Sequence, residues 1–160
     1  MFAMTVAKSG LKVKPMQPGD CVEFQQSRPM PTSADHKPIC SGVTSGARGP
    51  NAVWTFGGFK LSAVAGRLHR TLGRHVIDRT GVNDLFVMRL EFHPDENTPG
   101  IMWSPERDED TSAPIGASIF TALEQQLGLK LEPTKAPRGF LVIDHIERPS
   151  ANGGAPIGGR

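Results

Sequence analysis

The sequence predicts an α+β fold made of duplicated helix-strand-strand units, with two helices packed on one face of a mainly antiparallel sheet and with long Pro/Gly-rich loops. Three observations support this class. Two segments with helical spacing of apolar residues are each followed by strand-like segments, and these two units resemble each other at an offset of 55 residues. The 160 residues also include 18 glycines and 14 prolines, which favour long loops, and the length favours one domain.

The first unit covers residues 59–93. Its helix, at 61–72, has one apolar stripe formed by Leu61, Val64, Ala65, Leu68 and Leu72. Gly73 stands where a helix ends in a left-handed residue. A short strand at 75–77 and a turn lead to the strand at 85–92, whose alternation places on one face Phe86, Met88, Leu90 and Phe92.

The second unit covers residues 118–148. Ser118 is placed to cap a helix that ends at Gly128, and a strand at 129–131 follows. The apolar run that opens 140–147 predicts a strand buried on both faces. In the repeat alignment Glu91 falls on His145, so we expect the ends of these two strands to lie close together.

The rest of the chain is expected to add little regular structure. Residues 5–14 indicate a hairpin or a bent strand, and residues 53–60 an additional edge strand. The expected organisation is an N-terminal strand region at 1–14, a long loop at 15–52, an α+β domain at 53–150 and a flexible tail at 151–160.

Two cysteines, Cys21 and Cys40, lie 19 residues apart in the Pro-rich loop. A disulfide between them would stabilise the fold by roughly 3 kcal/mol through loop closure and would require an oxidising compartment. Two free thiols are the alternative. A zinc site at these cysteines is not indicated, because no CxxC or nearby Cys/His pair has metal-ligand spacing.

Charge excludes some partner classes. The net charge of +2 excludes a polyanion binder driven by bulk charge, and the basic helix face at Arg67, Arg70 and Arg74 lacks the interleaved aromatic residues of a nucleic-acid site. No apolar run approaches the ~20 residues of a membrane span. Residues 1–82 have a net charge of +7 and residues 83–160 of −5, which indicates either two solvated surfaces or a contact within a homodimer.

Three segments carry a resemblance to a known family: LGRHVIDRTG at 72–81, IFTALEQQLGLKLE at 119–132 and LVIDHIERPS at 141–150. They resemble an uncharacterised, soil-associated protein family of Acidobacteria. The resemblance implies an exported protein, periplasmic or extracellular, and this chain is similar to the C-terminal portion of a typical member. Residues 1–4 have neither the charged nor the apolar region of a leader, so we expect no signal peptide on this chain.

Polar residues at the ends of two predicted strands suggest a metal site. His93, Asp95 and Glu96 follow the strand at 85–92, while Asp144, His145 and Glu147 end the strand at 140–147. Converging histidines and carboxylates suit a divalent metal, zinc or calcium, that activates water, with catalytic roles for His93, His145 and Asp144. Ordinary solvated strand ends are the alternative.

A second group of candidate ligands lies in the polar insertion at 94–117. The alternating carboxylates Glu106, Asp108 and Asp110 resemble the start of a calcium loop. The glycine and the final acidic residue of such a loop are missing, so a solvated acidic insertion is the alternative.

The sequence supports two hypotheses about function, which belong to different classes. The first is a non-enzymatic binding or interaction domain of an exported soil-bacterial protein, with a small molecule or a protein as its partner. The second is a zinc- or calcium-assisted hydrolase of small esters or lactones such as acyl-homoserine lactones. The first is favoured because the sequence carries no GxSxG motif and no phosphate-binding glycine loop.

Overall fold

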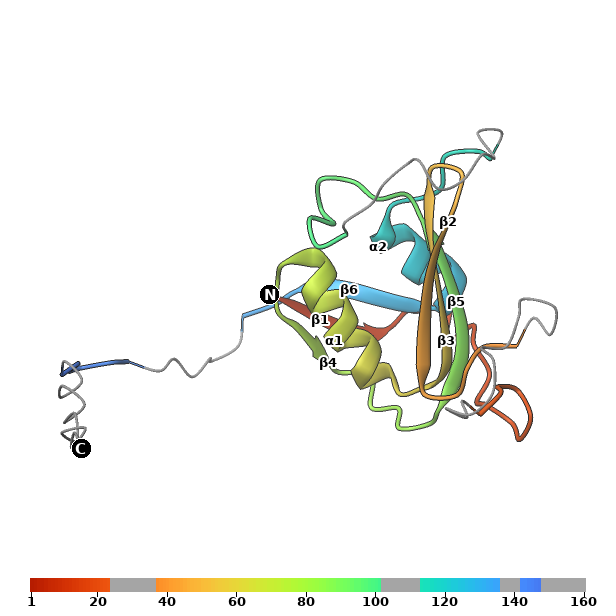
Figure 1. Ribbon diagram of the computed structural model, residues 1–160, viewed down its shortest axis with the longest axis horizontal. Coiled ribbons are helices and arrows are strands. Elements are labelled where there is room, and N and C mark those ends of the chain that lie inside the picture. The colour runs from red at the N-terminus through yellow and green to blue at the C-terminus, as the bar shows by residue number, and fades with distance from the viewer. Residues whose placement is uncertain (24–36, 102–112, 136–141, 148–160) are drawn as a thin grey trace, which may run out of the picture.

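The computed structural model describes residues 1–23, 37–101, 113–135 and 142–147. Within these ranges the fold is α+β, as the sequence predicts, but it has two three-stranded sheets rather than one (Figure 1). The elements are, in chain order, β1 (Phe2–Val6), β2 (Gly42–Arg48), β3 (Asn51–Phe59), α1 (Leu61–Leu72), β4 (Val76–Asp78), β5 (Phe86–Phe92), α2 (Ile119–Ala122), the π-helix η3 (Leu123–Leu127) and β6 (Leu129–Pro133).

The first sheet, sheet A, has the order β4-β1-β6. β1 runs parallel to β4, with Phe2 opposite Val76, and antiparallel to β6, with Val6 opposite Leu129. The strand expected within residues 5–14 is therefore shorter and earlier than predicted, because the chain leaves the sheet at Ala7 and turns. It is also the central strand and has no free edge.

The second sheet, sheet B, has the order β2-β3-β5 and is antiparallel throughout. β3 lies at its centre, so the prediction of an edge strand at 53–60 is wrong. The long loop predicted at 15–52 is also wrong in part, since it contains β2. The sequence of β2, GVTSGAR, lacks apolar alternation because the strand lies at the sheet edge and is largely exposed.

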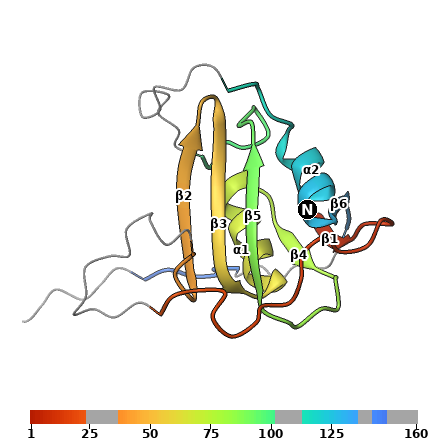
Figure 2. The same ribbon diagram turned by 90° about the vertical axis from the view of Figure 1, so that its right-hand side faces the viewer.

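The helix α1 covers the inner face of sheet B. Figure 2 looks onto the outer face of this sheet, with α1 behind it and α2 beside β5. The predicted apolar stripe of α1 is buried, and Gly73 ends the helix with φ of 60°. Arg67, on the same helix, stacks on the Trp54 ring at 4.7 Å and donates to Ser45 Oγ at 2.8 Å.

The second helix begins as predicted, because Ser118 Oγ accepts a hydrogen bond from the Thr121 N–H. Its last five residues form the π-helix η3 rather than an α-helix. It ends at Gly128, whose φ is 69°. A Cβ at Gly128 would also collide with the Gly10 carbonyl oxygen, so both the backbone angle and the space require glycine here.

One hydrophobic core joins both sheets and both helices. Sheet B contributes Trp54, Phe56 and Phe92, and the Trp54 and Phe92 rings meet edge to face with centroids 4.9 Å apart. The core side of β5 carries the four residues that its alternation predicts: Phe86, Met88, Leu90 and Phe92.

The predicted disulfide between Cys21 and Cys40 is present. It lies beside a parallel bridge between Val22 and Ile39, and the Ile39 carbonyl lies directly over Gly57 of β3. A Cβ at Gly57 would collide with that carbonyl, so the glycine lets the disulfide-linked segment pack on sheet B.

The predicted strand at 140–147 is wrong over residues 142–147, which have no regular structure. Val142, Ile143 and Ile146 are exposed there, so this apolar run is not buried. The duplicated unit is not confirmed either, since β4 lies in sheet A and β5 in sheet B. The tail at 151–160 lies outside the described residues. Within the described ranges, no helix is long and apolar enough to cross a membrane.

The substitution Leu127→Ala tests the packing of the second helix. Leu127 is 1% exposed, and we expect the free energy of unfolding to fall by about 2–5 kcal/mol. Urea denaturation followed by circular dichroism measures this, with Leu85→Ala, at a residue 41% exposed, as the control. A loss below about 0.5 kcal/mol at Leu127 would show that the helix does not pack on the sheets.

Reduction of Cys21–Cys40 tests the contribution of the disulfide. We expect native protein to resist alkylation, and reduction to lower the free energy of unfolding by roughly 3 kcal/mol through loop closure. Mass spectrometry under non-reducing conditions and urea denaturation measure the two effects. Two alkylatable thiols in native protein would contradict the prediction, and a Cys21→Ser/Cys40→Ser variant serves as the control that reductant leaves unchanged.

Candidate functional site

The first group of predicted metal ligands follows β5, but its side chains contact other groups of the protein instead of one another. The His93 ring donates from Nδ1 to the Pro50 carbonyl oxygen at 2.9 Å. The Asp95 carboxylate accepts the Asn97 N–H at 2.8 Å within a local turn. Glu96 lines a small hollow with Phe2 and other residues, and His93 is not part of that lining.

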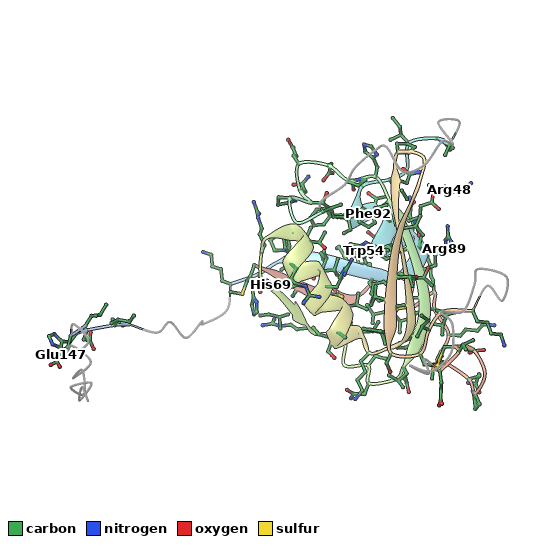
Figure 3. All side chains as sticks on the ribbon, viewed as in Figure 1. Arg48, Trp54, His69, Arg89, Phe92 and Glu147 are labelled. Atoms are coloured by element: carbon green, nitrogen blue, oxygen red, sulfur yellow. A yellow bond between two sulfur atoms is a disulfide. The ribbon has the colours of Figure 1, made fainter. Side chains whose placement is uncertain are left out.

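The second group lies elsewhere. Asp144, His145 and Glu147 belong to residues 142–147, and Figure 3 shows Glu147 far from Phe92, the last residue of β5. His145 Nε2 lies 3.4 Å from Glu147 Oε1, with both side chains exposed.

The predicted meeting of the two strand ends, Glu91 beside His145, therefore does not occur, because 142–147 pairs with no described strand. The described ranges hold no group of three or more His, Cys, Asp or Glu side chains able to bind a metal. Glu106, Asp108 and Asp110, the predicted calcium ligands, lie outside the described residues.

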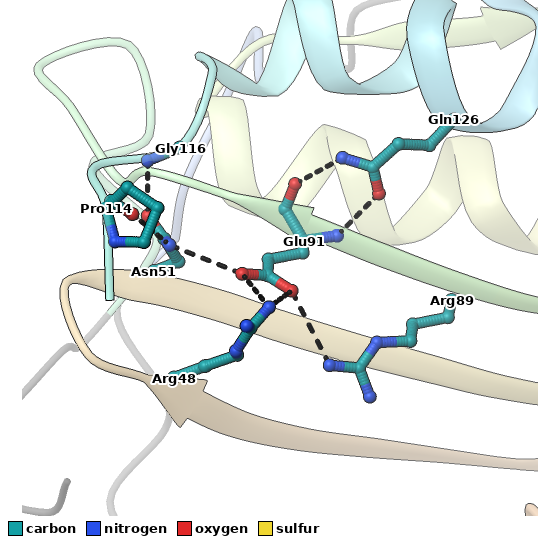
Figure 4. Close-up of polar contacts among 7 residues, drawn as sticks. All are labelled: Arg48, Asn51, Arg89, Glu91, Pro114, Gly116 and Gln126. Atoms are coloured by element: carbon teal, nitrogen blue, oxygen red, sulfur yellow. Dashed lines mark hydrogen bonds and ion pairs between the residues drawn. The ribbon is translucent and has the colours of Figure 1, made fainter. Parts of the chain in front are cut away.

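The structure instead gathers polar side chains around Glu91, at the outer face of sheet B. Arg48 Nη1 donates to both oxygens of the Glu91 carboxylate, at 3.4 and 3.3 Å. Arg89 Nη2 lies 3.5 Å from Oε2 of the same carboxylate (Figure 4). The side chain of Glu91 is 21% exposed, whereas those of Arg48 and Arg89 are 57% and 59% exposed.

Strand geometry explains why these side chains meet. Arg89 and Glu91 are two residues apart on β5 and so share a face. Arg48 ends β2 opposite Asn51, the first residue of β3, across the tight turn of the hairpin. Glu91 is paired with Val53, so the register of sheet B brings the end of this hairpin to the carboxylate.

Asn51 fixes the base of the site. It is 2% exposed, and its Nδ2 donates to Glu91 Oε1 at 3.3 Å and to the Pro114 carbonyl at 2.9 Å. Its Oδ1 accepts the Gly116 N–H at 2.7 Å. A Cβ at Gly116 would come within 2.9 Å of Oδ1, so a larger residue there would require the Asn51 side chain to shift.

Gln126 closes the neighbouring sheet edge. Its Nε2 donates to the Glu91 carbonyl at 2.6 Å, and its Oε1 accepts the Glu91 N–H at 2.9 Å. The amide thus makes the same pair of hydrogen bonds that an adjacent strand would make. Gln126 comes from η3, and π-helical turns are rare and occur frequently at functional sites.

These residues form an open pocket of about 350 Å³, lined by Arg48, Arg89, Glu91, Gly116, Ala117, Gln125 and Gln126. Two guanidinium groups surround one carboxylate, so the charged side chains of the pocket have a net charge of +1. A guanidinium has five N–H donors, and each arginine directs only one nitrogen to Glu91. Donors therefore remain for an anionic group.

Residues 1–146 match a family model described as "Protein of unknown function (DUF3738)". The chain belongs to the DUF3738 family. This match confirms the expected membership of an uncharacterised family. No curated protein and no solved structure matches this DUF3738 member.

The sequence pattern places Glu91 at a strand end but does not predict that the residues of this site come together. The spacing of Arg89 and Glu91 on a predicted strand was a usable signal, since it places both on one face. Arg48 and Asn51 were not identifiable, because β2 and its hairpin lay within a predicted loop. Gln126 is one of two adjacent glutamines, and the sequence pattern does not distinguish which of them reaches the sheet.

The substitution Gln126→Ala tests the closed sheet edge. It removes two hydrogen bonds to the Glu91 backbone, and we expect the free energy of unfolding to fall by about 1–2 kcal/mol. Hydrogen exchange of the Glu91 amide should accelerate at the same time. The matched control is Gln125→Ala, because the side chain of Gln125 lines the pocket without a hydrogen bond among the described residues.

An equal decrease in the free energy of unfolding for Gln126→Ala and Gln125→Ala would contradict the role of Gln126. For Gln125→Ala we expect the free energy of unfolding to change by less than about 0.5 kcal/mol, as is usual for exposed positions.

Proposed function

We propose that this DUF3738 chain is a non-enzymatic binding domain of an exported soil-bacterial protein. Its binding site is the pocket beside Arg48 and Arg89, and its ligand is an anionic group carried by the partner. The observation that supports this most is the exposure of both guanidinium groups around a carboxylate that is itself held in place.

The distances favour an additional anion. Charge-assisted hydrogen bonds between guanidinium and carboxylate are about 2.7–2.9 Å long. The contacts of Arg48 and Arg89 with Glu91 are 3.3 to 3.5 Å long, so neither arginine is saturated by this carboxylate. A second carboxylate or a phosphate on the solvent side gains two cationic donors without displacing Glu91.

Glu91 acts as a positioning residue in this proposal. Asn51 fixes its carboxylate and Gln126 fixes its backbone, so the two guanidinium groups share a stationary anchor. An anchored arginine loses less side-chain entropy when its ligand binds. The pocket is also open, which suits a group that projects from a larger partner.

The disulfide supports the exported part of the proposal. Disulfides such as Cys21–Cys40 persist mainly in oxidising compartments, such as the periplasm and the extracellular space.

A fluorescent hexaglutamate peptide tests the anion site. We expect saturable binding by fluorescence anisotropy at low salt, and weaker binding at about 0.5 M salt because partly exposed charges are screened. Arg48→Gln and Arg89→Gln should each raise the dissociation constant by about threefold to fivefold, as expected for partly exposed charge pairs. Inorganic phosphate as a competitor distinguishes a general anion site from one that prefers carboxylate.

The matched control is Arg79→Gln, which removes an exposed arginine away from the pocket. An equal effect of this control, or no saturable binding to the peptide, would overturn the anion site.

A turnover assay separates the proposal from the metal-assisted hydrolase. We expect no hydrolysis of small esters, γ-lactones or acyl-homoserine lactones above the buffer rate, with zinc, calcium or a chelator present. Chelator-sensitive turnover that is lost in both His93→Ala and His145→Ala would contradict the proposal and favour the hydrolase.

A further inference from the structure

Residues 142–147, here called the C-terminal arm, expose most of their apolar surface. Val142 is 71% exposed, Ile143 is 65% exposed and Ile146 is 79% exposed. Figure 1 shows this segment projecting from the body of the molecule, on the side opposite β2.

The arm has the composition of a strand without a partner. Three of its six residues are β-branched and apolar, a type enriched in strands, yet none of the six is in a sheet. Contiguous apolar exposure of this kind marks an interaction segment. An extended chain gains backbone hydrogen bonds when it is added to an open sheet edge.

Among the described strands, β2 offers the best edge for such an addition. The outer edge of β5 is closed by Gln126, by the Ala117 carbonyl and by the bridge of Pro15 to Phe86. β4 has only three residues, and β6 ends at Pro133, which has no N–H. β2 has seven residues, and no backbone group from Val43 to Arg48 bonds outside β3 to any described residue.

We propose that the C-terminal arm of one copy adds to β2 of a second copy as a fourth strand of sheet B. Exchange of both arms gives a two-fold dimer, which is the closed arrangement that a reciprocal contact produces. The proposal rests on the arm and on β2, which shares Arg48 with the anion pocket.

The side-chain pattern of the arm fits this edge. In an extended arm Val142, Asp144 and Ile146 share one face. The inner face of β2 carries Val43, Ser45 and Ala47, since these residues are paired with the core residues of β3. Val142 and Ile146 on that face would extend the apolar layer, and Asp144 would lie near Ser45.

The charges of the two segments are complementary. β2 has Arg48 and no carboxylate, and Arg67 of α1 reaches its Ser45. The arm carries Asp144 and Glu147. Burial, together with the nearby Arg70, lowers the pKa of Arg67, so a carboxylate placed beside it would stabilise its charge.

A cross-linking experiment between full-length copies tests the exchange. One preparation carries Thr44→Cys, at an exposed position of β2, and the other carries His145→Cys in the arm. The native cysteines are oxidised, so a short bismaleimide reacts only with the new thiols. The control pairs the arm variant with Lys8→Cys, an exposed residue outside β2.

We expect the mixed Thr44/His145 product to form roughly a hundredfold faster than the control at about 10 µM protein, because adjacent thiols have effective concentrations near millimolar. Light scattering on the unmodified chain should give twice the 17.2 kDa of one copy, and Val142→Asp/Ile146→Asp should give a monomer.

Three results would overturn the proposal. These are a monomeric mass at every concentration, cross-linking no faster than in the control, and a dimer that persists in the Val142→Asp/Ile146→Asp variant. Circular dichroism of that variant establishes that it is folded, since both positions are exposed in the single copy.

Discussion

The side-chain amide of Gln126 and the backbone of Glu91 exchange two hydrogen bonds, and both the β5 edge of sheet B and the neighbouring pocket depend on this pairing. It ties the second helix to β5, although Gln126 follows Glu91 by 35 residues in the chain. It closes a sheet edge without using a strand, and it holds the residue whose carboxylate positions Arg48 and Arg89. The same contact therefore contributes to stability, limits strand pairing and builds the pocket.

The two edges of sheet B consequently have different properties. The β5 edge is covered by Gln126, Ala117 and Pro15, so it presents side chains to the solvent. The β2 edge presents backbone groups beside small side chains. Edge strands with free backbone groups pair readily with other chains, whereas side-chain clusters recognise charge and shape. The two proposals therefore assign a second copy to the β2 edge and an anionic partner to the pocket beside β5.

Local patterns in the sequence predicted the elements that bury one face. The stripe on α1, the alternation on β5 and the glycines after both helices were sufficient for the α+β class. These local patterns did not predict the structure of segments that depend on pairing with strands distant in the sequence. β2 is stabilised by β3 rather than by its own apolar residues, and the apolar run in 142–147 has no strand beside it. The candidate site was missed for the same reason, since the sheet register brings Arg48 and Asn51 to Glu91.

Nuclear magnetic resonance tests the proposed binding site most directly. In a titration of the ¹⁵N-labelled chain with hexaglutamate, we expect the largest shift changes in the Nε–H groups of Arg48 and Arg89 and in the side-chain amide of Gln126. Changes in the Glu91 and Ala117 backbone amides should accompany them, because both residues line the pocket. Shift changes confined to other surfaces, or none at saturating peptide, would contradict the assignment of this pocket as the binding site.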